Sequence, residues 1–384
     1  MNLKRLRATA TKEIREMLRD RFFLILAFIS PPVMMVIFGY GMNLDVENIP
    51  FVIVDYDNTP QSRDYASHYT ESRYFHFLGY VTDERQAQQL LLAARIRVAI
   101  IIPEHFGRRL AQGRSTAIQT LLDGANPLRA NMTKSYIIAI NSQVSLQQIT
   151  DFMATARGLH RSEAEAMLQP VRFEVRYLYN QGAKSRWSMV PKMIMMVLMM
   201  APPFLTAVGV VREKERGSIL NIYSSTVTKA EFLIGKLSPY AVVTAINGLA
   251  LWVIATQLFA VPFKGSFLFF MLATLAYTSC TTGIGLLVSL FVSTQAAAIV
   301  VTMIVTMIPA MLYSGIIIPL SSMGPLPRFM ALFTPAMHYT QIVDGTFLKG
   351  QGFLELWRPL LVLAGYGVIL FAIGHRLFTK RPRT

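Results

Sequence analysis

Cysteine and charge are both scarce in this chain. One cysteine, Cys280, occurs in 384 residues, so no disulfide can form within the chain and cysteine usage carries no information about its compartment. Charged residues make up 15% of the sequence and hydrophobic residues 53%, whereas soluble domains carry about a quarter charged residues. The composition therefore predicts a membrane protein with a soluble part.

Sequence signatures of catalysis and of bound cofactors are also missing. No G-x-x-x-x-G-K-[ST] motif is present to hold ATP phosphates, since Gly235-Lys236 is followed by Leu237 and lacks the earlier glycine. There is no H-E-x-x-H or G-x-S-x-G motif, and the histidines show no metal-ligand spacing. We therefore expect no enzyme activity, no cofactor and no metal in this chain. Asp55 and Asp57, at a strand end, fit either a cation site or a turn cap, and such pairs favour the cap.

The formal net charge of +15 raises the question of a nucleic-acid partner. Residues 42–188, the largest polar part, hold 16 Lys and Arg against 14 Asp and Glu, and are nearly neutral. Most of the positive charge therefore lies in segments that flank apolar runs, where it reports topology and attracts anionic lipid. We expect membrane lipid, and no nucleic acid, as a partner.

Six apolar runs have about the 20 residues that a helix needs to span a bilayer. They cover residues 22–41, 189–211, 241–261, 267–292, 295–318 and 356–378. The first run is too long for a signal peptide and lacks a cleavage site. Flanking Lys and Arg residues predict that both termini and residues 212–238 are cytoplasmic. The methionines between residues 193 and 200 suit either a surface for apolar ligands or ordinary packing.

The polar segments around these runs predict the remaining architecture. Residues 1–21 read as an amphipathic helix on the membrane surface or as a basic tail that only sets topology, and residues 379–384 as a cytoplasmic tail. Residues 42–188 alternate between strand and helix patterns, which predicts an α/β extracytoplasmic (periplasmic) domain. Strands are expected at 51–55, 74–81, 97–102, 118–122 and 171–177, and helices at 62–71, 83–95 and 128–168, the last broken near Gly158. The predicted fold class is thus an α-helical polytopic membrane protein with six transmembrane helices, and the α/β domain lies between helices 1 and 2.

The polar segment 212–238 is too long for a simple turn. It begins with Glu213-Lys214-Glu215-Arg216-Gly217-Ser218 and includes Gly235-Lys236. Gly217 allows the chain to turn without a side-chain clash. Apolar residues at 218–223 and at 229–237 predict helical structure within the segment. From composition alone, the charges either dock a partner or only hydrate a loop.

This motif resembles the cytoplasmic coupling loop of the type-2 ABC (ATP-binding-cassette) exporter permeases. Lys12-Glu13, Arg19-Asp20-Arg21 and Pro31-Pro32 are similar to the segment that leads into the first span in that family. The whole layout resembles its bacterial multidrug-type subfamily, which has a large external domain. The resemblance implies that Glu213, Glu215, Arg216, Gly217 and Ser218 couple the chain to a separate ATPase subunit, which carries ATP and Mg. It also implies a second permease copy or a paralogue, a periplasmic adaptor, and a place in the bacterial inner membrane.

Residues 319–352 are too long for a turn and too apolar for a free loop. Their pattern predicts short helices that dip back into the outer face of the membrane, where non-helical backbone must be buried in protein or line a cavity. Thr334-Pro335 and Phe347-Leu348-Lys349-Gly350 resemble the external re-entrant segment of the same family, the exit gate. The resemblance makes Pro335, His338 and Asp344 candidate gate residues, and Pro335 is expected to interrupt a short helix. Lys192, near the outer end of the second run, is expected to extend toward the membrane surface.

Two functions of different classes fit the sequence. The first is a permease subunit that exports an amphipathic or hydrophobic substrate, such as a drug, lipid or glycolipid, from the cytoplasm or inner membrane. The alternative is a membrane-anchored envelope receptor or scaffold whose external domain binds a partner without transport. An anchor has no need for the motif at residues 213–218, so co-purification with an ATPase separates the two.

Overall fold

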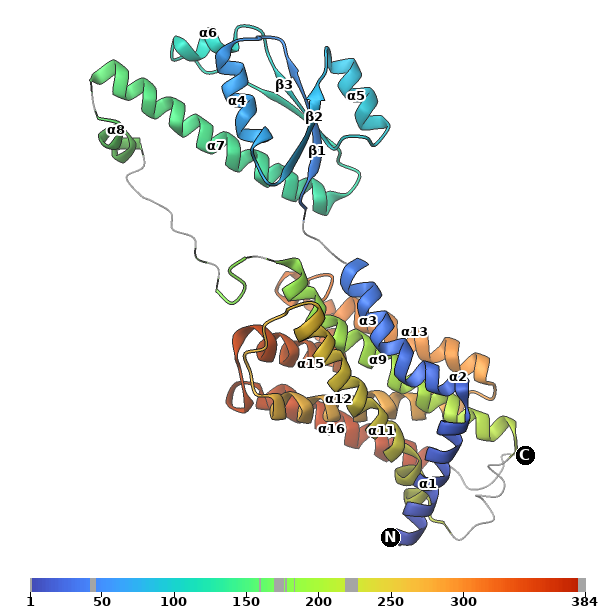
Figure 1. The fold of residues 1–384 in the computed structure, drawn as a ribbon. Helices are drawn as coiled ribbons and strands as arrows, with labels where there is room; N and C mark the ends of the chain where they lie inside the picture. The colour runs from blue at the N-terminus through green and yellow to red at the C-terminus, as the bar shows by residue number, and fades with distance from the viewer. Residues whose placement is uncertain are drawn as a thin grey trace. The chain divides into compact units, whose positions relative to one another are not determined.

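The computed structural model describes residues 2–41, 46–158, 160–168, 176, 178–182, 184–217 and 227–378. The chain divides into two compact units (Figure 1). One is Leu44–Arg176, and the other combines Met1–Asn43 with Tyr177–Thr384.

A four-stranded sheet forms the centre of the unit Leu44–Arg176. Its order is β2-β1-β3-β4, with β1 (Ile49–Asp55), β2 (Phe75–Tyr80), β3 (Val98–Ile102) and β4 (Gln119–Leu122). β1 pairs in parallel with β2 and β3, and β4 pairs antiparallel with β3. All five residues of β3 are buried, as expected for a strand that is covered on both faces. These strands confirm four of the five predicted from sequence; the fifth, at 171–177, lies almost wholly outside the described residues.

Helices cover both faces of this sheet because alternate strand residues point to opposite sides. On one face, Phe51 and Ile53 pack with Tyr65 of α4 (Pro60–Thr70), Phe106 of α6 (Phe106–Ala111) and Ile137 of α7 (Pro127–Arg157). On the other face, Val52 and Val54 pack with Ala87 of α5 (Glu84–Leu92). Figure 1 shows α5 on one side of the sheet and α4 and α7 on the other. α7 ends at Gly158 before α8 (Arg161–Leu168), which confirms the predicted break.

The turn after β1 is held by its two aspartates. Asp55 accepts hydrogen bonds from the backbone N–H groups of Asp57 and Asn58, both at 3.0 Å. Asp57 accepts from the N–H of Gly107 at 2.8 Å and from the hydroxyl of Thr59. Burial opposes ionisation of Asp57, but these hydrogen bonds outweigh it and lower its pKa. The contacts confirm the interpretation of this pair as a turn cap.

The second unit contains, among the residues described, five helices long and apolar enough to cross a membrane. They are α9 (Ser185–Glu215), α11 (Lys229–Val253) with its π-helical extension η2 (Ile254–Leu258), α12 (Phe267–Phe291), α13 (Gln295–Tyr313) and α16 (Phe353–Leu377). A sixth apolar helix, Ile25–Gly41, is shorter. It follows α1 (Leu3–Arg19) and α2 (Arg21–Leu24), and consists of η1 (Ile25–Ile29) and α3 (Ser30–Gly41). The chain is therefore a multi-pass membrane protein, and the crossing by its first apolar helix stays a prediction.

The polar segment between the second and third apolar runs is shorter than predicted. α9 continues to Glu215 and α11 begins at Lys229, so both ends of the predicted loop 212–238 are helical. The helical pattern expected at 229–237 is confirmed, while the one at 218–223 lies outside the described residues.

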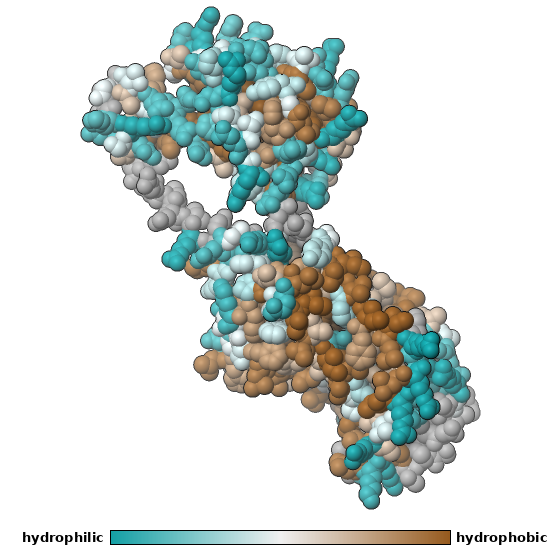
Figure 2. All heavy atoms as spheres, in the orientation of Figure 1, coloured by the Kyte–Doolittle hydropathy of each residue, from teal (hydrophilic) through white to brown (hydrophobic). Residues whose placement is uncertain are grey.

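α9 is the most buried of the five long helices. Met193, Met195 and Met199 lie in the core of the membrane unit, which supports ordinary packing as their role within this chain. Other helices of the membrane unit carry apolar side chains on its outer surface. On α11, for example, Val242 and Ile246 are exposed. Figure 2 shows this contrast on one face, with hydrophobic side chains over the helices and hydrophilic ones toward α1. Such a surface suits contact with lipid tails or with other membrane helices.

The first apolar helix contains a backbone carbonyl that proline leaves without a donor. The oxygen of Ala27 would accept from the N–H of residue 31 in an α-helix and from that of residue 32 in a π-helix such as η1. Both residues are prolines and have no N–H. Asn247 of α11 is buried and its side-chain amide donates to the Ala27 oxygen at 2.8 Å. A polar side chain within an apolar helix thus satisfies a backbone group that cannot be satisfied by water in a membrane.

The variant Asn247→Val should lower the thermal stability of the purified protein, because the Ala27 carbonyl then remains buried without a donor. Hydrogen bonds between membrane helices are worth about 0.6–1.7 kcal/mol, so we expect a loss in that range. Thermal unfolding in detergent, followed by circular dichroism, measures it.

Thr244→Val is the matched control, because the Thr244 hydroxyl donates to the Tyr240 carbonyl of its own helix and, among the described residues, bonds to no other helix. In a Pro31→Ala background, residue 31 regains an N–H and the effect of Asn247→Val should shrink. An equal loss of stability in both backgrounds would contradict the role assigned to Asn247.

Candidate functional site

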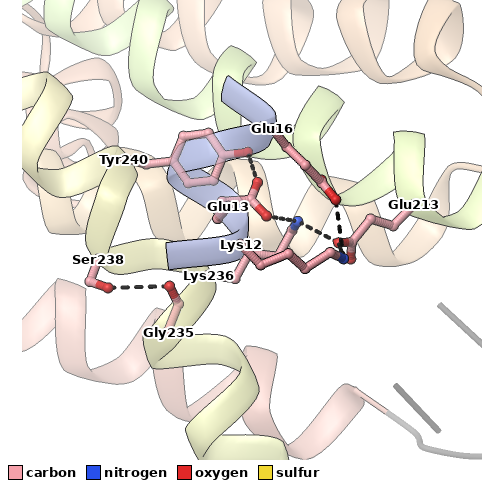
Figure 3. Close-up of polar contacts among 8 residues, drawn as sticks. All are labelled: Lys12, Glu13, Glu16, Glu213, Gly235, Lys236, Ser238 and Tyr240. Carbon is pink, nitrogen blue, oxygen red and sulfur yellow. Dashed lines mark hydrogen bonds and ion pairs between the residues drawn. The ribbon is translucent and has the colours of Figure 1, made fainter. Parts of the chain in front are cut away.

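Charged residues from three separate helices meet in one buried cluster. Lys12 and Glu13 come from α1, Glu213 from the end of α9, and Lys236 and Tyr240 from the beginning of α11 (Figure 3). We call these five residues the ionic cluster. The sequence motifs at 12–13, 213–218 and 235–236 are far apart in the chain, and folding brings them together.

Lys236 is the centre of the ionic cluster. Its Nζ lies 2.7 Å from Oε2 of Glu13 and 3.2 Å from Oε1 of Glu213. The second carboxylate also receives Lys12 Nζ, at 2.9 Å. The Tyr240 hydroxyl donates to Oε1 of Glu13 at 2.6 Å. Each carboxylate therefore contacts an ammonium group and at least one further donor.

Burial makes these ion pairs mutually dependent. The side chains of Lys236, Glu13 and Glu213 are 1%, 2% and 4% exposed. Removing such charges from water is expensive, and only good geometry and complete pairing offset it. Lys12 lies at the rim: partial burial opposes its charged form, but the hydrogen bond and charge of Glu213 outweigh this and raise the pKa of Lys12.

A glycine allows α1 to lie against α11 at this point. A Cβ on Gly235 would lie 2.8 Å from Thr9 Cβ and 3.0 Å from the Leu6 carbonyl oxygen, so no larger residue fits without a shift. Farther along, Glu231 accepts from the N–H of Asn2 at 2.6 Å. Gly235 therefore allows α1 and α11 to approach closely, and the next residue, Lys236, forms the ion pair with Glu13. The buried face of α1, with Glu13 and Met17, lies against protein.

A second ion pair secures the same helix ends. Arg212 of α9 pairs with Asp20, which follows α1, at 2.6 Å. The guanidinium carbon of Arg212 also lies 6.0 Å from the centre of the Phe23 ring, within range of a cation–π contact. α1 is thus joined to α9 by ion pairs at Lys12 and at Asp20.

The two residues after Glu213 bind the turn between α12 and α13. The ammonium group of Lys214 donates to the carbonyl oxygens of Ser289, Leu290 and Val292 at the end of α12. Glu215 accepts from the backbone N–H of Gln295, the first residue of α13, at 2.7 Å. A cation at a helix C-terminus and an anion at a helix N-terminus both complement the helix dipole. We call these contacts the Lys214–Glu215 clasp.

The predicted coupling residues therefore lie in different environments. Glu213 is buried in the ionic cluster, whereas Glu215 and Arg216 are exposed, and Glu215 accepts from the first N–H of α13. Gly217 has a φ of +69°, which confirms the turn predicted there. Ser218 lies outside the described residues. The role of these five residues in coupling stays a prediction. Glu215 and Arg216 are the exposed charges among those described. Because Glu215 is already bonded to Gln295, Arg216 is the better candidate for contact with a partner.

The external segment also contains the short helices that its sequence predicts. α14 (Pro325–Leu332), α15 (Pro335–Asp344) and the π-helical η4 (Gly345–Lys349) follow one another. Pro335 begins α15 at its first turn instead of interrupting a helix, a position where proline loses no hydrogen bond. His338 Nε2 lies 3.0 Å from the Leu332 carbonyl oxygen. Tyr339 stacks on Tyr277 of α12 with ring centres 4.2 Å apart, so α15 is packed into the membrane unit.

Lys192 and Asp344 form an ion pair that sequence reasoning missed. Their charged atoms lie 3.5 Å apart, with the side chains 14% and 27% exposed. Lys192 was expected to extend to the membrane surface, but it binds Asp344 of α15 instead. The sequence signal that could have predicted this pair is the presence of opposite charges in two otherwise apolar segments, because such residues usually pair with one another.

The carboxylates of the site were also considered as metal ligands. Oxygens of Glu13, Glu16 and Glu213 lie within 4.8 Å of one another. The ammonium groups of Lys12 and Lys236 lie against the same carboxylates, and they offset two of the three negative charges that would attract a cation. These three carboxylates therefore serve ion pairing.

The apolar helices, joined by charges at their ends, define a multi-pass membrane protein. Comparison with protein families agrees: the pattern described as ABC-2 family transporter protein matches residues 21–375. The chain belongs to this family.

Three bacterial relatives are similar to it over almost their whole length. The probable multidrug ABC transporter permease YbhS of Escherichia coli K12 is 27% identical over 383 residues, covering 99% of this chain and 98% of the relative. The probable multidrug ABC transporter permease YbhR of the same organism is 26% identical over 371 residues, covering 95% and 96%. The inner membrane transport permease YhhJ, also from that organism, is 25% identical over 372 residues, covering 96% and 95%. The chain is accordingly a permease subunit of an ABC transporter, and ATP hydrolysis belongs to a separate ATPase subunit.

The variant Lys236→Met should strongly destabilise the protein, because Glu13 and Glu213 would then share a buried site without their common cation. Breaking a buried pair by removing one partner costs about 3–5 kcal/mol. We expect little monodisperse protein after purification and a lower midpoint of thermal unfolding.

Lys4→Met on the exposed side of α1 is the matched control and should change neither quantity. The double variant Glu13→Gln with Lys236→Met removes both charges of one pair and should recover part of the loss. A Lys236→Met protein as stable as the unmodified chain would show that the ionic cluster does not hold α1 in place.

Proposed function

We propose that this chain is the permease subunit of an ABC exporter. It moves an amphipathic or hydrophobic substrate, such as a drug, lipid or glycolipid, out of the cytoplasm or inner membrane. The word multidrug in two of the relatives' names supports this substrate class. The observation that carries the proposal is the set of contacts at the end of α9, because they join the predicted coupling segment to four other helices.

These contacts give the coupling segment a stiff connection to the membrane helices. The ionic cluster ties the end of α9 to α1 and α11, and the Lys214–Glu215 clasp ties it to α12 and α13. Buried ion pairs resist separation because each charge left behind is costly. A displacement imposed on Arg216 and Gly217 by an ATPase therefore moves these helix ends together. A membrane anchor for a receptor or scaffold has no use for such a connection.

The proposed topology follows from the charge distribution. Both termini and the segment around Arg216 face the cytoplasm, where positive residues accumulate. Leu44–Arg176 and residues 319–352 are then on the outer side, the former as an extracytoplasmic domain that meets substrate or a periplasmic adaptor. ATP and Mg bind the ATPase subunit, and this chain itself binds no cofactor. A second copy or a paralogue completes the pathway.

The proposed exit gate is α15 with its neighbours. Pro335 sets where the helix begins, and the pairing of Asp344 with Lys192 fixes its other end against α9. His338 holds the preceding turn through the Leu332 carbonyl. Because α9 carries both this pair and the coupling motif, movement at one end of α9 reaches the other through a single helix.

The variant Arg216→Glu should weaken the association with the ATPase and leave the folded permease intact, because Arg216 is exposed at the end of α9. The measurements are the amount of ATPase that co-purifies with the permease and the rate of ATP hydrolysis by the complex in proteoliposomes. Glu215→Ala is less informative, since it also removes the acceptor for the first N–H of α13.

Arg95→Glu in the proposed external unit is the matched charge reversal and should change neither measurement. Normal co-purification and hydrolysis for Arg216→Glu would mean that this residue is only solvated surface. If no ATPase co-purifies with the unmodified chain, the receptor or scaffold alternative is favoured.

The topology is tested by cysteine labelling in a Cys280→Ser background. A cysteine at Gln89, exposed on α5, should react with a membrane-impermeant maleimide in intact spheroplasts. A cysteine at Thr11, exposed on α1, should react only after permeabilisation. Labelling of position 11 in intact spheroplasts would show that the chain has the opposite orientation. The segment around Arg216 would then not face a cytoplasmic ATPase.

A further inference from the structure

A cavity of about 580 Å³ lies within the unit Leu44–Arg176. Its walls come from α4, α6, the segment 113–118 and the middle of α7. Phe106, Leu110, Val144 and Phe152 make much of the wall apolar. The size falls within the range of pockets that hold small organic molecules, about 300–1,000 Å³.

The rim of this cavity exposes apolar surface that no described residue of the unit covers. Ile149 and Phe152 of α7 are each 48% exposed, and both line the cavity. They follow the apolar floor formed by Val144, which is almost fully buried. An apolar ring system placed here would remove both side chains from water, which is favourable.

Two polar groups that line the cavity have no hydrogen-bond partner among the described residues. Oδ1 of Asn141 accepts from the hydroxyls of Tyr65 and Tyr69, at 2.5 and 3.2 Å, and its amide nitrogen donates to no described residue. The hydroxyl oxygen of Thr116 is buried and has no partner. Buried polar groups are normally satisfied, so the Thr116 hydroxyl calls for a group that a ligand supplies. The half-buried Asn141 adds an amide donor to the same lining.

The charge of the lining is of one sign. Arg114 is the cation, and no aspartate or glutamate is among the residues that line the cavity. An amide N–H, a hydroxyl and a guanidinium together donate hydrogen bonds to an acceptor-rich, negatively charged group. The apolar walls suit a ligand with an apolar ring system better than a peptide of polar residues.

We infer that this cavity binds a small organic anion that combines an apolar ring system with a carboxylate, sulfonate or phosphate group. The rings lie against Phe106, Val144 and Phe152, and the acidic group lies toward Asn141, Thr116 and Arg114. The site belongs to one unit and depends on neither export nor the ATPase. Its test and the tests of the proposed function can therefore fail separately.

Binding is measured by fluorescence titration of anilinonaphthalenesulfonate, which has fused rings and a sulfonate, against the full chain in lipid nanodiscs. The signal of empty nanodiscs is subtracted. We expect a saturable component of one probe per chain. Ser145→Phe fills the cavity from an exposed position on α7 and should weaken that component about tenfold or more. Ser142→Phe is the matched control, because Ser142 is exposed on the same helix outside the lining.

Charge and donor variants test the orientation of the probe. Arg114→Glu should weaken binding, and Arg108→Glu, an exposed arginine of α6 outside the lining, should not. Asn141→Asp keeps the acceptor for the two tyrosines and removes the amide donor, so it should weaken binding with the fold intact. Phenylnaphthylamine, which has the rings without the sulfonate, should bind less tightly than the sulfonate.

Two outcomes would overturn the inference. The first is a saturable component that Ser145→Phe leaves unchanged, because the probe would then bind elsewhere. The second is that the neutral probe binds as tightly as the anion and that Arg114→Glu does not change its affinity. The cavity would then be a site for apolar molecules or for an apolar protein segment. Circular dichroism of each variant separates loss of binding from loss of fold.

Discussion

The ammonium group of Lys236 is the constraint on which the membrane unit depends. At 1% exposure its burial is offset only by anionic partners, and its partners come from two other helices. Glu13 requires α1 to lie along α11, and Glu213 requires the end of α9 to reach the same point. A helix that amphipathicity alone would leave on the membrane surface is thereby held by specific pairs. The position of α1 is set by electrostatics within the protein, with lipid contact left to its outer side.

The same principle explains other polar groups in this apolar unit. In a membrane, each backbone group that lacks a regular partner needs a substitute from nearby protein. Asn247 supplies a donor to the carbonyl opposite Pro31, Lys214 supplies donors to the last carbonyls of α12, and Glu215 accepts from the first N–H of α13. Each lies where a helix ends or departs from regular hydrogen bonding. These three polar residues therefore mark places where the backbone needs a partner from outside its own helix.

Local patterns accounted for much of the fold. Buried strands such as Val98–Ile102, the break at Gly158 and the turn at Gly217 depend on residues that are neighbours in sequence, and each was predicted. The ionic cluster was not, because Glu13 lies 223 residues from Lys236 in sequence and about as far from Glu213, and no local pattern reports which charge meets which. For the same reason Lys192 was assigned to the membrane surface when its partner is Asp344. The family resemblance had already drawn attention to all three motifs of the cluster, but their common location became visible only in the folded chain.

The Lys214–Glu215 clasp has a geometric consequence. Two consecutive side chains hold opposite ends of adjacent helices, a carbonyl terminus and an amide terminus, so the α12–α13 hairpin cannot swivel independently about α9. It behaves as a lever whose fulcrum lies near that turn. α13 has 19 residues, and at 1.5 Å per residue it is about 28 Å long. A tilt of about 5° at the clasp thus displaces the far end of α13, where the chain continues toward α14 and α15, by roughly 2.5 Å. Angular amplification of this kind would turn a small movement beside the ATPase into a shift comparable to the width of a side-chain contact.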